Sequence, residues 1–326
     1  MHTMSTPPLI LTREAARMGS DHLLRDLHRA AAAVRLRAGV YIDATAWSGM
    51  DADERYRTRV RAVAAVSRPD AQFSHDSAAA MWRLPSIGPW PERVHEVVAW
   101  RGGGSNRVGV TAHGQGVDSD PVMIDGVVVT SLARTLVDVA RTSSMVRSVA
   151  MLDAGLRRPR QDEFRHPFID PPPSREELDQ QLERLGAARG ATRAARAIAF
   201  ADPGAESPGE SFARIQFHAL GYPPPVLQRE FFDELGVIGI ADFYWPQLDL
   251  ALEFDGRSKY GNSRKYQRGM TLEQILMREK DRERRFRRVV TNFDRLGWEL
   301  VEDRARLARY LAPYGLVPPG RLRPRT

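Results

Sequence analysis

A strand–turn–strand pattern in the last third of the chain constrains the fold more than any other sequence feature. The turn sequence at residues 246–249 separates two segments in which hydrophobic residues alternate with polar ones. If Trp245 pairs with Leu250 across this turn, then Asp242 lies opposite Glu253 on the neighbouring strand. Directly opposed residues have Cβ atoms about 4.5–5.5 Å apart on one face of a sheet. The pattern therefore predicts two carboxylates that face each other.

The two faces of this predicted hairpin differ in character. One face is apolar and would carry Ala241, Phe243, Trp245, Leu250, Leu252 and Phe254. The other face carries Asp242, Glu253 and Asp255, since side chains two positions apart point the same way. Carboxylates this close repel each other unless a proton or a cation intervenes. A hairpin with a solvated acidic edge is the simpler interpretation, and a metal site is the functional one.

A divalent cation with a phosphodiester substrate would explain the acidic face. Mg²⁺ binds one or two protein carboxylates together with waters and phosphate oxygens. We therefore expect Mg²⁺ (or Mn²⁺) as the cofactor bound at this acidic face. A bound ion can activate water and stabilise charge during phosphoryl transfer. Lys259, just beyond the second strand, would stabilise an attacking or leaving oxygen.

Glu210 has two interpretations that the sequence leaves equal. Ser207-Pro-Gly-Glu210 has the spacing of a capping box, with Pro at the first helical position. In the first interpretation Glu210 only completes the start of a helix. In the second, that helix brings Glu210 to the same site as Asp242.

The composition narrows the class of protein. A net charge of +7 and an isoelectric point of about 10.0 favour polyanionic partners such as nucleic acid. Cysteine is absent, which excludes disulfides and thiolate metal sites. No apolar run approaches the roughly 18–20 residues of a membrane span, and residues 1–11 lack a signal-peptide pattern. We therefore expect a soluble cytoplasmic protein without a membrane partner.

Lysines and histidines are unusual in their distribution. Of 48 Lys plus Arg, only Lys259, Lys265 and Lys280 are lysines, and all three fall in one short stretch. Because arginine so strongly outnumbers lysine in this chain, a lysine is a better indicator of a functional position than a scattered arginine. The eight histidines show neither an HExxH motif nor a closely spaced pair. His75 is predicted to be a helix-start or core residue.

The order of helical and strand-like segments predicts a mixed α+β chain of the α/β class. At about 100–200 residues per domain, two or three domains are expected. The predicted regions are a winged helix-turn-helix at 1–50, an α+β middle domain at 51–156, a Pro-rich linker with helices at 157–200, an α/β core at 201–315 and a basic tail at 316–326.

The first region has the element order of a DNA-binding winged helix. Helices are predicted at residues 12–18 and 21–32, followed by a strand pair that turns at Ala38-Gly39. A recognition helix would place basic residues near bases in the major groove, while wing residues would contact phosphates. The DNA-binding candidates are Arg25, His28 and Arg29 on the helix and Arg35 and Arg37 on the wing. A solvated helix face, or a module that contacts protein, is the simpler interpretation.

The C-terminal region resembles a nuclease family. Its clearest signal is Ala-Asp-Phe-Tyr-Trp-Pro at 241–246, followed by Leu-Ala-Leu-Glu-Phe-Asp-Gly at 250–256. These residues resemble the endonuclease-like domain grouped with very-short-patch repair enzymes, in the PD-(D/E)XK nuclease superfamily. The resemblance implies a restriction-endonuclease-like α/β core with two metal ligands, Asp242 and Glu253. It also implies that Glu210 is an accessory acid on the first helix.

The chain departs from the superfamily pattern at two positions. The superfamily lysine would lie two residues after Glu253, where the chain has Asp255, which the resemblance makes a further acidic site residue. Many relatives have a histidine six residues after the glutamate, where the chain has Lys259. Lys280 and Arg282 on the following helix are candidates to supply phosphate contacts instead, but a solvated or DNA-facing surface is the simpler interpretation of the basic run at 278–288.

The N-terminal region resembles a second family. Leu-Thr-Arg-Glu-Ala-Ala-Arg-Met-Gly at 11–19 and Leu-Arg-Ala-Gly-Val-Tyr at 36–41 are similar to the winged-helix N-terminus of AbiEi-type antitoxins. The resemblance continues through Ser74-His75, Leu84-Pro85 and the segment 125–135. It implies a DNA-binding module and, for an antitoxin, a cognate toxin as partner.

Two functions from different classes are compatible with these patterns. In the first, the chain is a metal-dependent endodeoxyribonuclease that binds DNA, with Glu210, Asp242, Glu253, Asp255 and Lys259 as catalytic residues. In the second, it is a transcriptional regulator or antitoxin-like repressor whose nuclease fold no longer cuts. The retained acids favour the enzyme, and the missing lysine favours the regulator.

Overall fold

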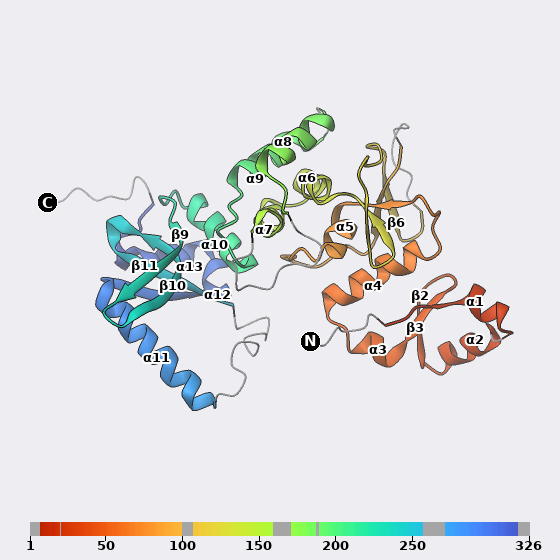
Figure 1. Ribbon diagram of the computed structural model, residues 1–326, viewed down its shortest axis with the longest axis horizontal. Coiled ribbons are helices and arrows are strands. Elements are labelled where there is room, and N and C mark those ends of the chain that lie inside the picture. The colour runs from red at the N-terminus through yellow and green to blue at the C-terminus, as the bar shows by residue number, and fades with distance from the viewer. Residues whose placement is uncertain are drawn as a thin grey trace. The chain divides into compact units, whose positions relative to one another are not determined.

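The structure, a computed structural model, describes residues 7–19, 21–99, 107–158, 171–186, 189–256 and 271–318. The chain divides into two compact units, Met1–Phe200 and Ala201–Thr326 (Figure 1). Both units mix helices with strands, and the named strands form three sheets. The expected α/β class with mixed α+β content is therefore confirmed. Within the described ranges, no helix combines the length and the apolar character needed to cross a membrane.

The first unit begins with a small sheet and two helices. Its elements are β1 (Ile10–Leu11), α1 (Thr12–Arg17), α2 (Asp21–Arg29), β2 (Ala33–Arg37) and β3 (Val40–Asp43). The strands are antiparallel in the order β1-β3-β2. Gly39 has φ +78°, a conformation that glycine adopts without a Cβ clash, and this permits the tight turn between β2 and β3. The two helices and the strand pair lie where the sequence pattern predicts them, whereas β1 was not predicted.

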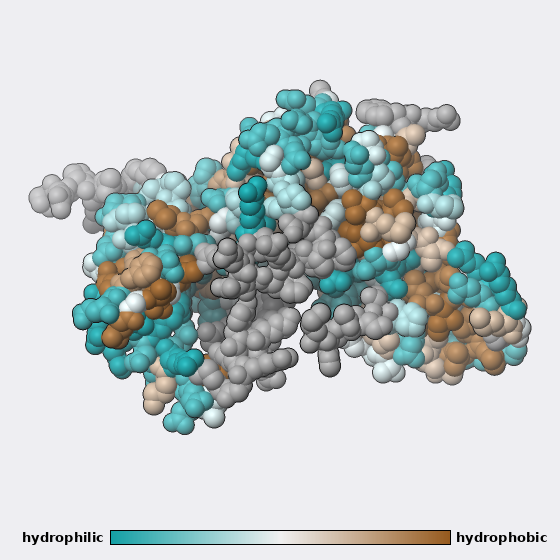
Figure 2. Space-filling model, in the orientation of Figure 1, coloured by the Kyte–Doolittle hydropathy of each residue, from teal (hydrophilic) through white to brown (hydrophobic). Residues whose placement is uncertain are grey.

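Helix α2 buries only a narrow stripe. Leu24 is 5% exposed and packs with Ala15, Ala33 and Tyr41. Leu23 and Leu27, in contrast, are 51% and 43% exposed. Hydrophobic side chains gather on the visible surface of this N-terminal part (Figure 2), so its surface is not purely basic.

The middle of the first unit is a five-stranded sheet covered by helices. Its elements are α3 (Ala44–Ser48), α4 (Ala52–Ala64), β4 (Gln72–Phe73), α5 (His75–Met81), β5 (Val94–Val97), β6 (Val110–His113), β7 (Val122–Ile124), β8 (Val127–Val129), α6 (Leu132–Thr142) and α7 (Met145–Leu156). The strand order is β6-β5-β4-β8-β7. Every residue of α5 is buried, because this helix packs against α4, α6 and the sheet.

Two helices expected in a linker region belong instead to the first unit. They are α8 (Arg175–Arg184) and α9 (Ala191–Phe200). Both pack against α6 and bury Leu178, Ala197 and Ile198 almost completely. The Pro-rich stretch that suggested a linker begins in residues 159–170, which are outside the described residues, and ends just before α8. Apolar burial, rather than linker composition, therefore decides where residues 175–200 belong.

The second unit is a four-stranded sheet between helices. Its elements are α10 (Pro208–Ala219), β9 (Val226–Asp233), β10 (Gly236–Trp245), β11 (Leu250–Asp255), α11 (Leu272–Val289), β12 (Asn292–Gly297), α12 (Trp298–Val301) and α13 (Arg304–Leu311). The strand order is β12-β11-β10-β9. Strands β11 and β12 are parallel, and the other neighbours are antiparallel. Trp245 pairs with Leu250, so the expected register of the hairpin is confirmed.

Both faces of this hairpin are covered, which corrects the expectation of one core face and one acidic face. On one face, Phe243 and Trp245 contact Phe217 of α10 at ring-centroid distances of 5.2 and 5.1 Å. On the other face, Ala251 and Tyr244 pack with Phe286 of α11. Helix α11 covers this face because it connects two parallel strands and must cross a face of the sheet to do so.

We expect Gly209→Ala to destabilise the second unit. A Cβ atom at residue 209 would lie 2.0 Å from Cε1 of Phe254, so the ring would have to move. Overpacking of this kind lowers the free energy of unfolding by about 1–3 kcal/mol. Urea unfolding of the full chain would measure this change. Gly256→Ala is the matched control, because nothing lies within 4 Å of a Cβ atom there. Equal free energies of unfolding for the two variants would contradict this close packing.

Candidate functional site

Three acidic side chains from three elements approach one another in the second unit. Glu210 lies in the first turn of α10, Asp242 in β10 and Glu253 in β11. The amide nitrogen Nε2 of Gln228 donates to Oε2 of Glu210 at 3.0 Å and to Oδ1 of Asp242 at 3.2 Å. The hairpin register continues from Phe243 opposite Leu252, which sets Asp242 beside Glu253. Asp242 and Glu253 therefore lie side by side, as the hairpin pattern predicts, and Glu210 joins them.

Gln228 was not singled out by the sequence, yet it joins two of the acids. Its backbone has φ +52°, which is uncommon for a residue with a side chain. Such a conformation costs of order 1–3 kcal/mol and persists only where the surroundings fix it. The two side-chain hydrogen bonds help to offset that cost. A glutamine within a strand carries no signal of this role, since its sequence context is ordinary alternation.

Ser207 caps α10, but the side chain of Glu210 does not complete the capping box with the backbone of Ser207. The backbone N–H of Glu210 donates to Oγ of Ser207 at 3.2 Å, which caps α10. Its carboxyl Oε2 accepts from the backbone N–H of Glu206 at 2.8 Å and also from Gln228. Glu210 is 6% exposed, so its side chain is turned inward rather than solvated. Glu210 thus contributes to the start of the helix and faces Asp242.

Asp242 is held on both of its oxygens. Oδ2 accepts from the backbone N–H of Phe254 at 2.6 Å, and Oδ1 accepts from Gln228. The bond to Phe254 crosses from β10 to β11, so the carboxyl group acts as part of the strand pairing. Asp242 is therefore fixed in orientation, which a preorganised site requires.

Glu253 is paired with two arginines that come later in the chain. Arg282 of α11 donates to both carboxyl oxygens of Glu253. Nε of Arg295 in β12 lies 3.5 Å from Oε2 of Glu253. Glu279 accepts hydrogen bonds from the same two arginines. The sequence pattern indicated Arg282 only as a phosphate contact and carried no signal for Arg295 or Glu279. The negative charge of Glu253 is thus compensated within the protein.

Burial raises the pKa values of all three acids. Desolvation raises the pKa of Glu210 to about 8, and the nearby charge of Asp242 adds to the effect. Desolvation also raises the pKa of Asp242. It raises the pKa of Glu253 to about 7, although Arg282 and Arg295 oppose the shift. At neutral pH the site therefore retains protons that a bound cation would displace.

The other residues predicted near this site are Asp255, Lys259 and Lys280. Asp255 ends β11, where its Cα pairs with that of Gly297 of β12, and the alternation of the strand sets it on the face of Glu253. Lys259 lies outside the described residues. Lys280 is exposed on α11, and no described contact joins it to the three acids.

Most of the predicted DNA-binding residues of the first unit are exposed, but some also have partners within the protein. Arg25, Arg29 and Arg35 are exposed, although Arg29 forms an ion pair with Asp26 at 3.1 Å. His28 has a hydrogen-bond partner in its own fold, since its Nδ1 lies 3.1 Å from the carbonyl oxygen of Ala33.

Arg37 is less accessible than its place on the predicted wing suggests. It is half-buried, and burial lowers its pKa, with the charge of Arg107 acting in the same direction. Arg107 in turn binds Glu96 of β5. Arg37 therefore faces the middle sheet of its own unit, whereas Arg35 remains the exposed arginine of the strand pair.

Comparison with known proteins gives relatives but no family. No protein-family model matches the chain. The chain is similar to uncharacterized proteins from two strains of Mycobacterium tuberculosis, at 33% identity over 148 residues in each case. The similarity covers 45% of this chain and 50% of each relative. The chain therefore spans about half the length of the curated relatives it matches.

The raised pKa values lead us to expect a pH-dependent stability. An unfolded glutamate loses its proton near pH 4.3, whereas folded Glu210 and Glu253 keep theirs until about pH 8 and 7. Between those limits the folded state binds more protons, so stability falls as pH rises. Glu210→Gln should flatten this decline between pH 5 and 8, measured by urea unfolding. Exposed Glu230→Gln is the control, and a slope unchanged in Glu210→Gln would contradict the assignment.

Proposed function

We propose that this protein binds DNA and that its C-terminal unit hydrolyses phosphodiester bonds with Mg²⁺ or Mn²⁺. The observation that carries the proposal is the convergence of Glu210, Asp242 and Glu253 from three elements. Burying three carboxyl groups together is costly unless something compensates their charge. A bound cation would compensate the charge of these carboxyl groups and could then bind a phosphate group.

The donor set fits a hard divalent cation. All the candidate ligand atoms are carboxylate oxygens, which Mg²⁺ and Mn²⁺ prefer. A single amide nitrogen of Gln228 now satisfies oxygens of both Glu210 and Asp242, so both oxygens already point toward a common donor. Asp242 and Glu253 would hold the ion, with Glu210 behind them. When bound, such an ion supplies an activated water and stabilises charge on the phosphate.

The protein's own residues have distinct roles in this proposal. Gln228 and the N–H of Phe254 orient Asp242 before substrate arrives. Glu210, with a pKa raised by burial to about 8, can hold or release a proton near neutral pH. Arg282 and Arg295 compensate Glu253 in the absence of substrate and would attract a phosphate group once that carboxylate has another partner.

The first unit would hold the DNA. Arg25 and Arg35 are exposed on α2 and β2, and the chain carries a net charge of +7. Phosphate neutralisation by such residues supplies sequence-independent affinity. The exposed Leu23 and Leu27 beside them also suit a protein contact, which is the alternative role of this module.

A second candidate function is favoured by the arginine pairs. Arg282 and Arg295 neutralise Glu253 without a metal ion, and Asp255 stands where the nuclease superfamily that the sequence resembles has a lysine. In this alternative the protein is a transcriptional regulator or antitoxin-like repressor with a cognate toxin as partner. Repression of a promoter by a chain that cleaves no substrate would support it, and so would a toxin gene next to its own.

We expect Asp242→Asn and Glu253→Gln each to reduce metal-dependent cleavage by about 10²–10³-fold, the usual cost of losing one preorganised electrostatic group. The assay uses plasmid and single-stranded DNA with Mg²⁺, Mn²⁺ or EDTA. DNA affinity should change little, because carboxylates repel phosphate and contribute no affinity without an ion. Exposed Glu230→Gln is the control for a charge change elsewhere in the sheet.

The same assay decides between the two candidates. If the unsubstituted chain cleaves neither substrate with either metal, the enzyme proposal fails. If Asp242→Asn cleaves as fast as the unsubstituted chain, the acidic site is not the source of the activity.

We also expect duplex binding by the full chain to depend strongly on salt. Removing one arginine that neutralises a phosphate should lower the slope of log affinity against log salt by about 0.9. Arg25→Ala combined with Arg35→Ala should therefore weaken binding and reduce this slope, measured by fluorescence anisotropy between low and physiological salt. Arg68→Ala, an exposed arginine outside α2 and β2, is the control. Binding unaffected by the double substitution would make the module a protein-contact surface.

A further inference from the structure

Three histidines from separate segments of the first unit meet in space. His75 is the first residue of α5, His95 lies in β5 and His113 ends β6. One ring nitrogen from each lies within 4.8 Å of the others. Parallel strands β5 and β6 bring His95 and His113 to one face through the pairs His95–Thr111 and Val97–His113. The backbone N–H of Ser74 donates to the carbonyl of His95 at 3.0 Å, which sets the start of α5 beside them.

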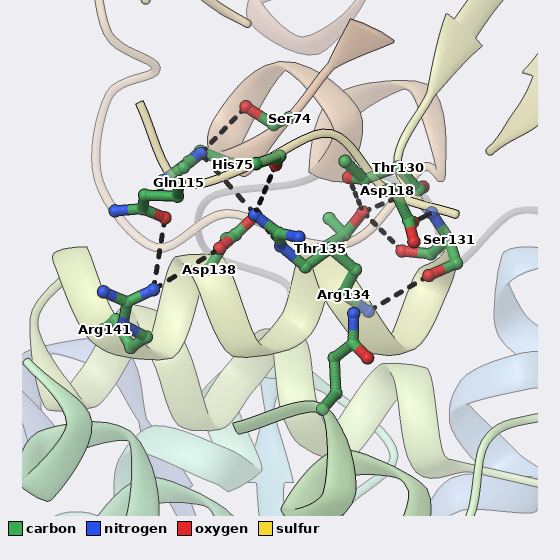
Figure 3. Close-up of polar contacts among 12 residues, drawn as sticks. Ser74, His75, Gln115, Asp118, Thr130, Ser131, Arg134, Thr135, Asp138 and Arg141 are labelled. Carbon is green, nitrogen blue, oxygen red and sulfur yellow. Dashed lines mark hydrogen bonds and ion pairs between the residues drawn. The ribbon is translucent and has the colours of Figure 1, made fainter. Parts of the chain in front are cut away.

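The two nitrogens of His75 have different surroundings. Nδ1 lies 2.9 Å from the hydroxyl of Ser74 and 3.9 Å from Oδ2 of Asp138 (Figure 3). Nε2 is buried and has no hydrogen-bond partner among the described residues, although the His75 side chain is only 1% exposed. An unsatisfied buried nitrogen is costly. A polar partner on one ring nitrogen with the other left available is the arrangement that metal-ligating histidines show.

The other two rings complete the group. Nδ1 of His95 lies 2.9 Å from Nε2 of His113, so these two rings share one proton or turn their lone pairs to a common partner. The ring centroids of His75 and His113 are 3.7 Å apart and nearly parallel. His95 and His113 are only partly buried, so an ion could reach the group from their side.

The electrostatics of the pocket keep the imidazoles neutral. Burial lowers the pKa of His75 and of His95, and it lowers the pKa of His113 to about 4. At neutral pH all three rings therefore offer lone pairs. Two arginines of α6, Arg134 and Arg141, lie near the group, and Asp138 pairs with both, with Nε of Arg134 2.9 Å from its Oδ2.

We propose that His75, His95 and His113 bind one late first-row divalent metal ion, with Zn²⁺ as the first choice. Neutral imidazole is a preferred ligand of Zn²⁺, at about 2.0–2.1 Å from the ion. Ser74 and Asp138 orient His75 from behind, as outer partners of ligating histidines do. Two ligands of a tetrahedral ion lie about 3.4 Å apart, so the rings of His75 and His113 must move out of their stacked arrangement to meet one ion.

This site is independent of the proposed nuclease function and differs from it in chemistry. Its ligands are nitrogen atoms in the first unit, whereas the acidic site of the second unit offers oxygen atoms that suit Mg²⁺. Three histidine ligands leave a fourth position for water or a small ligand. The ion would also tie β5, β6 and the start of α5 together, and so stabilise the middle sheet.

The test measures Zn²⁺ binding by the full chain, prepared without a histidine tag and stripped of metal. Calorimetry and elemental analysis give affinity and stoichiometry, and Co²⁺ absorption in the visible range reports tetrahedral nitrogen coordination. We expect one ion per chain and a higher melting temperature with Zn²⁺. His95→Ala and His113→Ala should each abolish this saturable binding while circular dichroism stays native. His22→Ala, on the exposed face of α2, is the matched control.

Two further variants keep the test decisive. Ser74→Ala retains all three ligands and should weaken Zn²⁺ binding about 10-fold, the lower end of the effect of losing an outer partner. Asp242→Asn should leave it unchanged, because it alters only the acidic site. The proposal is overturned if the unsubstituted chain binds no Zn²⁺ or Co²⁺ saturably. Binding by His113→Ala equal to that of the unsubstituted chain would overturn it as well.

Discussion

The second unit depends on the register between β10 and β11, and Asp249 fixes that register. Its backbone turns through φ +42° between the strands. Its carboxylate accepts from the hydroxyl of Tyr244 at 2.9 Å and from the backbone N–H of Thr291 at 2.7 Å. The hairpin turn and the start of β12 are thus tied to one side chain. A slip of one residue would turn Asp242 to the other face of the sheet and disrupt the acidic site.

Charge compensation explains much of what surrounds that hairpin. Buried carboxylates need hydrogen bonds or counter-charges, and here Gln228, Arg282 and Arg295 supply them. The first unit solves a similar problem with Asp138, which is fully buried between Arg134 and Arg141. In both units the polar groups lie where helices cover a sheet, so the same packing that builds the core also desolvates the charges.

The sequence revealed features that depend on local pattern. The hairpin pairing followed from a turn and an alternation, and the helix start at Ser207 followed from its capping pattern, which left the role of Glu210 open. Arg282 and Arg295 escaped prediction as partners of Glu253 because only the path of α11 brings them there. His75, His95 and His113 escaped for the same reason, since strand pairing rather than spacing unites them. Helices α8 and α9 were predicted but grouped with the Pro-rich linker at 157–200, since only their packing against α6 shows that they belong to the first unit. The two-residue strands β1 and β4 are too short to show alternation.

The parallel pairing of β11 with β12 has a consequence for the order of folding. A hairpin closes within microseconds because its strands are adjacent in the chain, whereas parallel neighbours wait for a long connection to close. Asp242 and Glu253 therefore meet before Arg282 and Arg295 arrive. In that interval the nascent hairpin carries uncompensated negative charge and repels polyanions. The charge of Glu253 is thus compensated only late in folding, when β12 docks.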